Sequence, residues 1–99
     1  MKLDCASFLS HFRASAPGSA VLLDVRNDDE VAGGILPNAV HIPLGTLAVR
    51  ALELPRDKAI YVYCGSGLRA EKARDVLVNI GFPHVVVASG GGYIQLAGG

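Results

Sequence analysis

The chain has 99 residues, of which 51% are hydrophobic, and its formal net charge is zero because nine basic residues balance nine acidic ones. These values predict a single domain, residues 1–99, and the lack of a Lys/Arg run argues against a nucleic acid partner. No stretch is apolar for long enough to form a membrane helix, nor does the start resemble a signal peptide, so we expect a cytoplasmic location and no membrane partner.

The first half of the chain alternates helix and strand signals. Asp4 is placed to cap a first helix, which carries Phe8 and Phe12 on one face. The apolar run at 21–25, VLLDV, is typical of a strand buried on both faces, as in parallel sheets. The acidic residues at 28–30 suit the first turn of a short helix, because negative charge is favourable at a helix N-terminus.

The second half repeats this alternation. Further strands are predicted at residues 39–42, 59–63 and 84–88, and further helices at about 46–54, 71–80 and 93–97. Strands that alternate with helices indicate an α/β fold in three layers, with a mostly parallel central sheet and helices on both faces. In such sheets the functional residues gather at the carboxyl ends of the strands.

Cys64 stands at such an end, directly after the strand predicted at 59–63, and residues 65–68, GSGL, separate it from Arg69. A thiol reacts as its thiolate, which a nearby helix N-terminus favours. The two glycines of the loop allow backbone N–H groups to converge on one atom, and Arg69 adds a fixed positive charge. The stretch therefore predicts an anion-binding loop with a sulfur at its base.

Three chemistries fit such a loop: sulfane sulfur transfer through a cysteine persulfide, phosphate or arsenate chemistry through a thiolate, and anion or nucleotide binding with the cysteine incidental. A buried structural cysteine is the non-functional alternative. Residues 65–70 match the dinucleotide fingerprint G-x-G-x-x-G/A, but no acidic residue ends the next strand to hold a ribose. Thiolate phosphatases typically place one residue more between their Cys and Arg, so this loop favours a sulfur-sized cradle.

The remaining candidate ligands show no pattern typical of a metal site. Cys5 lies far from Cys64 in the sequence, and nothing requires a disulfide between them. The three histidines, at positions 11, 41 and 84, are isolated and lack the spacing of metal ligands. We therefore expect no metal and no cofactor.

Three segments together resemble the single-domain rhodanese family, the thiosulfate sulfurtransferases. They are LLDVRNDDEVAGGILPNAVHIPL at 22–44, YCGSGLRAEKARDVLVNIGF at 63–82 and VVVASGGGYIQLAGG at 85–99. The resemblance covers nearly all of the chain from residue 20 onward. It implies a rhodanese-like three-layer α/β fold and a sulfurtransferase that moves sulfane sulfur from thiosulfate or another persulfide donor to cyanide or a thiol.

The resemblance also assigns roles to single residues. Cys64 matches the nucleophile that carries the persulfide. The residues that match the loop around that sulfur, and so bind the donor, are Gly65, Ser66, Gly67, Leu68 and Arg69. Asp24 and Arg26 match a pair beside the site, for which we expect a structural role, with Arg26 paired to Glu30 and Asp24 bracing the loop. The implied partners are a small anionic sulfur donor and a thiol, cyanide or protein acceptor.

Two departures from the family bear on the donor. Ile35 stands where many members have a histidine, and Ala70 stands where many have Ser or Thr. The apolar Leu68 also makes the rim of the loop less polar, which favours sulfur chemistry in general over thiosulfate in particular. The alternative to an enzyme is a non-catalytic rhodanese-like binding or regulatory module, against which the intact cysteine loop argues.

Overall fold

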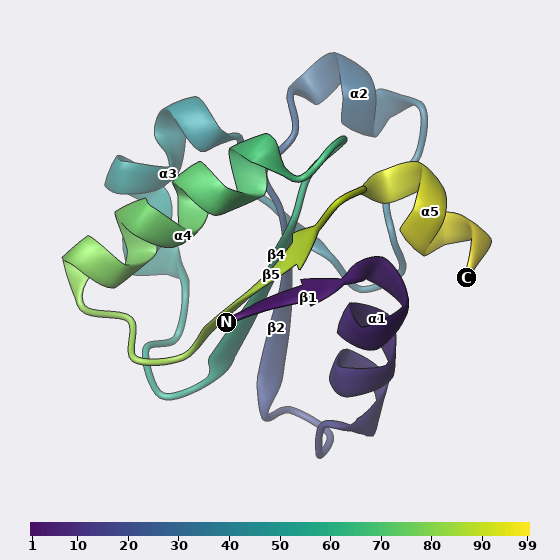
Figure 1. Cartoon of the computed structure of the whole chain (residues 1–99). Coiled ribbons are helices and arrows are strands. Elements are labelled where there is room, and N and C mark those ends of the chain that lie inside the picture. The colour runs from purple at the N-terminus through teal and green to yellow at the C-terminus, as the bar shows by residue number, and fades with distance from the viewer.

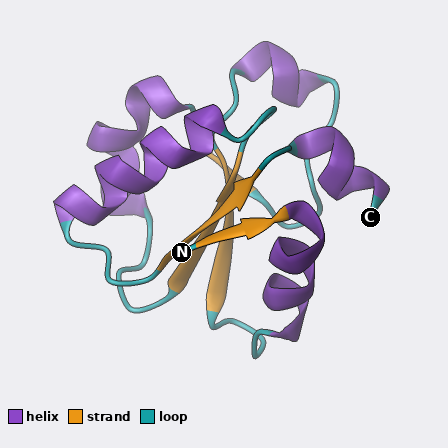
Figure 2. Cartoon of the chain, in the orientation of Figure 1, coloured by secondary structure: helices purple, strands orange, loops and turns teal.

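A parallel sheet of five strands forms the middle layer of the computed structural model, which describes all residues from Met1 to Gly99 (Figures 1 and 2). The strands are β1 (Lys2–Asp4), β2 (Ala20–Asp24), β3 (Val40–His41), β4 (Ala59–Tyr63) and β5 (Val85–Ser89). Their order across the sheet is β1-β5-β4-β2-β3, and every neighbouring pair is parallel. The carboxyl end of the central strand β4 is therefore flanked by those of β2 and β5.

Helices cover both faces of this sheet. They are α1 (Cys5–Ala14), α2 (Asp28–Ala32), α3 (Leu44–Arg50), α4 (Leu68–Ile80) and α5 (Tyr93–Gly98), with a short 3₁₀ helix, η1 (Ala51–Glu53), after α3. In Figure 1, α3 and α4 lie on one face, α1 and α5 lie on the other, and α2 lies near the carboxyl end of the sheet. This confirms the predicted three-layer α/β fold. None of these helices has both the length and the apolar character that crossing a membrane requires.

The central strand β4 contributes to two separate cores. Ile60 and Val62 are buried in the core that faces α3 and α4. Tyr61 and Tyr63 alternate with them and are buried in the core that faces α1 and α5. Because successive side chains of a strand point to opposite faces, a strand covered by helices on both sides has to be apolar throughout. Cys64 follows this strand and belongs to the core of Ile60 and Val62.

The strand β1 is absent from the sequence prediction, which contains four strands. It lies at the edge of the sheet, where Lys2 is in register with Val87 and Asp4 with Ser89. Only three residues form it, so it shows no readable alternation of apolar side chains. The helix predicted after it is confirmed: Asp4 caps α1, and its Oδ1 accepts a hydrogen bond from the backbone N–H of Ser7 at 2.8 Å.

Two helices begin earlier than their apolar pattern predicts. α4 begins at Leu68 rather than at residue 71, because Gly67 adopts a φ of 104° and turns the chain from the loop directly into the helix. The helix predicted at 46–54 begins at Leu44, immediately after Pro43, and its last turn is the 3₁₀ helix η1. The early start of α4 matters for the site, because it brings the helix N-terminus closer to Cys64.

Candidate active site

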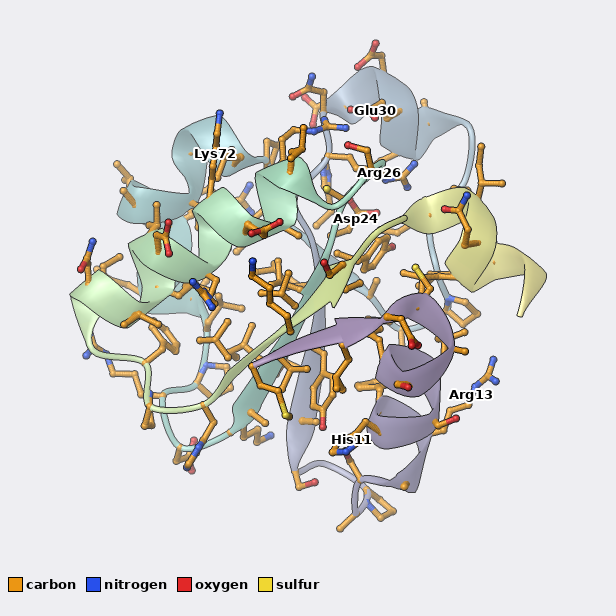
Figure 3. All side chains as sticks on the ribbon, viewed as in Figure 1. His11, Arg13, Asp24, Arg26, Glu30 and Lys72 are labelled. Atoms are coloured by element: carbon orange, nitrogen blue, oxygen red, sulfur yellow. The ribbon has the colours of Figure 1, made fainter.

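Cys64 lies at the carboxyl end of the central strand, beside the ends of β2 and β5. Backbone hydrogen bonds hold these segments together: Val25 N donates to the carbonyl oxygen of Tyr63 at 3.2 Å, and Tyr93 N donates to that of Cys64 at 2.9 Å. Figure 3 shows the side chains of Asp24, Arg26 and Glu30 at this same end of the sheet. The fold therefore brings acidic and basic side chains from separate elements to the cysteine.

The Cys64 sulfur accepts two backbone hydrogen bonds from the start of α4. The N–H of Gly67 lies 3.0 Å from Sγ, and the N–H of Ala70 lies 3.3 Å from it. Gly67 directly precedes the helix and Ala70 is its third residue, and at these positions no intrahelical carbonyl is available to an N–H group. They direct the positive end of the helix dipole at the sulfur, which stabilises a thiolate or the anion of a persulfide.

Ala70 contacts the sulfur at the candidate site, and the sequence prediction did not include it. The predicted cradle consisted of residues 65–69, whereas the N–H groups that reach Sγ belong to Gly67 and Ala70. Ala70 acts only through its backbone, so its side chain carries no chemical signal. A helix start placed at Leu68 would have identified it, because the N–H of the third helical residue is then free to bind an anion.

Cys64 has no solvent-exposed surface. Burial by itself is typical of a structural cysteine, which packs as a small apolar side chain. A neutral thiol in a core has no requirement for two converging N–H donors, however, whereas a thiolate has. The hydrogen bonds from Gly67 and Ala70 are thus a feature that a structural cysteine does not require.

The glycines around Cys64 allow close packing rather than general flexibility. A Cβ on Gly92 would collide with the carbonyl oxygen of Cys64 and with the backbone of Gly65. The segment after β5 therefore packs directly on the cysteine loop. Gly65 leaves room for the side chain of Arg69, because a Cβ at position 65 would lie only 2.9 Å from Nη2 of Arg69.

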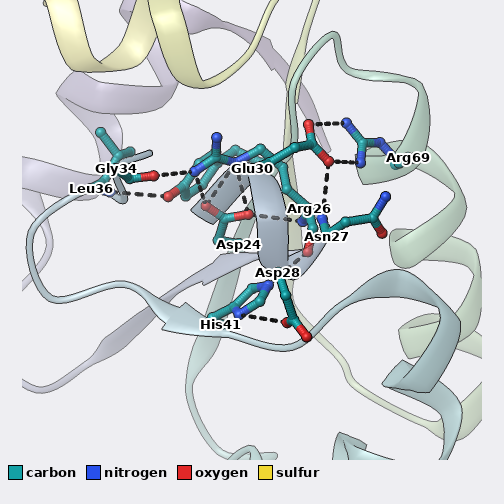
Figure 4. Close-up of polar contacts among 10 residues, drawn as sticks. Asp24, Arg26, Asn27, Asp28, Glu30, Gly34, Leu36, His41 and Arg69 are labelled. Atoms are coloured by element: carbon teal, nitrogen blue, oxygen red, sulfur yellow. Dashed lines mark hydrogen bonds and ion pairs between the residues drawn. The ribbon is translucent and has the colours of Figure 1, made fainter. Parts of the chain in front are cut away.

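Arg69 is held by Glu30 in a bidentate ion pair, which we call the Glu30–Arg69 clamp (Figure 4). Nη1 of Arg69 lies 2.5 Å from Oε1 of Glu30, and Nη2 lies 2.9 Å from Oε2. The backbone N–H of Asn27 also donates to Oε1 of Glu30 at 3.0 Å. The hydrogen bonds from Arg69, and then that from Asn27, lower the pKa of Glu30 to about 2. The clamp is therefore ionised at neutral pH, and it links α2 to α4.

Asp24 and Arg26 form a second ion pair, which is buried (Figure 4). Oδ1 of Asp24 accepts from the backbone N–H of Arg26 at 2.8 Å, and Oδ2 accepts from Nη2 of Arg26, also at 2.8 Å. The same Nη2 donates to the carbonyl oxygen of Gly34 at 2.7 Å. The guanidinium lies 4.1 Å from the ring centroid of Tyr93, which is within range of a cation–π interaction.

The predicted partners of Arg26 and Asp24 are wrong. Arg26 pairs with Asp24 rather than with Glu30, and Glu30 rather than Asp24 braces the cysteine loop, through Arg69. The reason is local geometry: Asp24 and Arg26 are two residues apart at a strand end, where alternate side chains share a face. Glu30 lies on the next helix and faces the start of α4.

The other predicted loop residues differ in exposure. Gly67 is buried, Gly65 is half-buried and Ser66 is exposed. Leu68 has 69% of its surface exposed. The largest groove of the molecule, about 520 Å³, lies elsewhere, between α1 and α5, where Phe12 and Leu96 contribute to its lining.

Comparisons with known proteins agree with this geometry. The sequence profile described as Rhodanese-like domain matches residues 11–93. A protein of Allochromatium vinosum named Sulfurtransferase is 34% identical over 71 residues, which cover 72% of this chain and 66% of that protein. The putative sulfurtransferase YtwF of Bacillus subtilis is 41% identical over 69 residues, which cover 70% of this chain and 67% of the relative. The matched stretch thus spans about two thirds of each relative's length.

A solved structure shows the same architecture. The rhodanese-like domain protein from Staphylococcus aureus superposes with a TM-score of 0.80 at 28% sequence identity, covering 91% of this chain and 85% of that one. The chain therefore belongs to the rhodanese-like domain family.

Proposed function

We propose that this protein is a sulfurtransferase that carries sulfane sulfur as a persulfide on Cys64. The observation that carries the proposal is the pair of N–H groups, from Gly67 and Ala70, that donate to Sγ of Cys64. Membership of the rhodanese-like family and relatives named sulfurtransferase support a role in sulfur transfer in general. The donor is thiosulfate or another persulfide-type compound, and the acceptor is cyanide, a thiol or a protein thiol.

The reaction has two displacement steps. In the first, the Cys64 thiolate attacks the outer sulfur of the donor, the sulfur–sulfur bond of the donor breaks, and the leaving group, sulfite when thiosulfate reacts, departs with the electron pair. In the second, the acceptor attacks the outer sulfur of the Cys64 persulfide and Sγ leaves as the thiolate. Atoms and electrons balance without an external oxidant, and the kinetics are ping-pong.

The backbone of the loop supplies the electrostatic part of this mechanism. Sγ of Cys64 is an anion before the first step and again after the second, and the N–H groups of Gly67 and Ala70 stabilise that charge in both states. These donors are fixed by the start of α4, so little reorganisation is needed as charge returns to the sulfur. Because Cys64 is fully buried, a donor reaches Sγ only when residues of the loop above it move.

The same burial is the observation that favours a second candidate, a rhodanese-like binding module without catalysis. A thiolate phosphatase is less well supported, because Arg69 is engaged by Glu30 rather than free to bind a phosphoryl group. Turnover of a phosphotyrosine analogue would support a phosphatase instead.

The experiment that tests the proposal is intact-mass measurement after incubation with thiosulfate and, separately, with an organic sulfane-sulfur donor. We expect a mass gain of one sulfur atom that disappears on addition of cyanide. The matched control is Cys64→Ser, which should show no gain, while a Cys5→Ser variant should behave like the natural sequence, because burial and the adjacent Asp4 raise the pKa of the Cys5 thiol. No gain with either donor would favour the binding module.

A further inference from the structure

Both guanidinium groups beside the cysteine loop are already paired with carboxylates. Arg69 is held by Glu30 at 2.5 and 2.9 Å, and Arg26 is held by Asp24 at 2.8 Å. These four side chains carry two positive and two negative charges, so their sum is zero. The anion-stabilising groups directed at the sulfur are the backbone N–H groups of Gly67 and Ala70. The site is therefore arranged for a single negative charge on sulfur.

This balance disfavours a donor with two negative charges. Thiosulfate carries two negative charges and, in the proposed reaction, meets the Cys64 thiolate. An anion that leaves water for a partly enclosed site requires a compensating charge, and an arginine already held in a bidentate pair does not supply one without breaking that pair. A donor with one negative charge and a carbon group in place of an oxygen avoids this requirement.

The side chain of the loop residue before Arg69 is consistent with the same kind of donor. Leu68 has 69% of its surface exposed and carries no polar group, so it offers nothing that would bind the second charge of thiosulfate.

Building on the proposed Cys64 persulfide, we infer that Glu30 is a positioning residue that sets donor specificity: by holding Arg69, it withholds positive charge from the donor. The site then selects a monoanionic organic sulfane-sulfur donor over the thiosulfate dianion. In the transfer, the bond between the outer sulfur and the organic leaving group breaks, and a bond from Sγ of Cys64 to that sulfur forms. The leaving group takes the electron pair, and no oxidant or reductant is consumed.

The probes are methanethiosulfonate and thiosulfate, which differ by a methyl group in place of one charged oxygen. We would measure kcat/KM for each with cyanide as acceptor, and divide each value by the rate of the same donor with free cysteine. We expect this normalised ratio to favour methanethiosulfonate by about tenfold, the effect of one charge-assisted hydrogen bond. A normalised ratio close to one in the natural protein would overturn the inference, whatever the variants do.

The variant Glu30→Gln is expected to raise kcat/KM for thiosulfate by about tenfold and to change that for methanethiosulfonate much less. The double variant, Glu30→Gln with Arg69→Gln, removes the freed positive charge as well and should return the ratio to that of the natural protein. If the double variant instead keeps the ratio of Glu30→Gln, or if Glu30→Gln leaves the ratio unchanged, Glu30 does not act through the charge of Arg69.

The control variant is Glu53→Gln, which breaks the bidentate pair between Arg50 and Glu53, at 2.9 and 3.1 Å, away from the cysteine loop. It should leave the donor ratio unchanged. The outcomes separate the inference from the function on which it rests. If the persulfide forms equally well from both donors, only the inference about Glu30 is refuted. If no persulfide forms with either donor, the proposed function is refuted and the inference with it.

Discussion

Asp24 and Arg26 pair within one strand end, two residues apart, whereas Glu30 and Arg69 pair across 39 residues of sequence. The first pair has side chains that are 0% and 5% exposed, and both side chains of the second are 31% exposed. A buried pair cannot exchange its partner for a solute without leaving a charge in the core. The partly exposed Glu30–Arg69 pair can lose its carboxylate without leaving a buried charge, so a substitution of Glu30 frees Arg69 for the donor. We therefore assign the first pair to structure and the second to specificity.

The largest expected effect is on stability, from the buried pair. Asp24→Asn leaves the Arg26 guanidinium buried without its counter-charge, so the free energy of unfolding should fall by about 3–5 kcal/mol. Urea denaturation followed by circular dichroism measures this change. A loss below about 1 kcal/mol, which is typical of an exposed pair, would contradict the structural role of Asp24.

The next effect concerns the packing of the segment after β5 on the cysteine loop. Gly92→Ala places a Cβ against the carbonyl oxygen of Cys64, so it should reduce the free energy of unfolding by about 1–3 kcal/mol, the usual range for overpacking. Formation of the Cys64 persulfide should fall in parallel. Gly98→Ala is the matched control in α5, because a Cβ there meets nothing within 4 Å. If both variants have the same free energy of unfolding and form the persulfide equally well, the close approach of Gly92 to the cysteine loop is not required for either.

The clamp should contribute less to stability, and its contribution should depend on pH. Glu30→Gln is expected to lower the free energy of unfolding by about 1 kcal/mol at neutral pH, since the pair is only half-buried. The pKa of Glu30 lies at about 2, below its usual value of 4.5, so the contribution is fully present above pH 4.5 and is lost as pH falls through about 2. The difference in melting temperature between the natural protein and Glu30→Gln should shrink as the pH is lowered from 7 to 3. A difference that stays constant over this range would contradict the ion pair.

The smallest effect is expected from an ion pair outside the site. Arg50 and Glu53 form a bidentate pair whose side chains are 40% and 54% exposed. Solvent screens such a pair, so Glu53→Gln should leave the melting temperature and the rate of persulfide formation unchanged. A fall in melting temperature as large as that caused by Glu30→Gln would mean that the exposure of an ion pair does not decide its contribution to stability.

Local patterns were sufficient to predict much of this protein. The apolar run at 59–63 corresponds to β4 at the same residues, and the cysteine loop follows it as expected at the carboxyl edge of a parallel sheet. These features depend on neighbouring residues, whose alternation and turn preferences act over a few positions. The strand β1 escaped prediction because its three residues acquire their structure from pairing with β5, which is distant in the sequence.

The pairing of the charged residues could not be predicted in this way. The positions of Asp24, Arg26, Glu30 and Arg69 near the site followed from the motifs, but the pairing among them did not. An arginine side chain is long and flexible enough to reach several acids, so sequence spacing alone does not select one. The orientation of α2 against the start of α4 selects Glu30 for Arg69.

By itself, the sequence determined the alternation of strands and helices, the place of Cys64 at a strand end and the glycines around it, because these depend on short-range sterics and on the periodicity of apolar residues. Only the tertiary structure decided which N–H groups reach the sulfur and which acid holds which arginine. Those contacts join elements whose relative placement comes from packing against a shared core, and a few ångströms of displacement would exchange one partner for another.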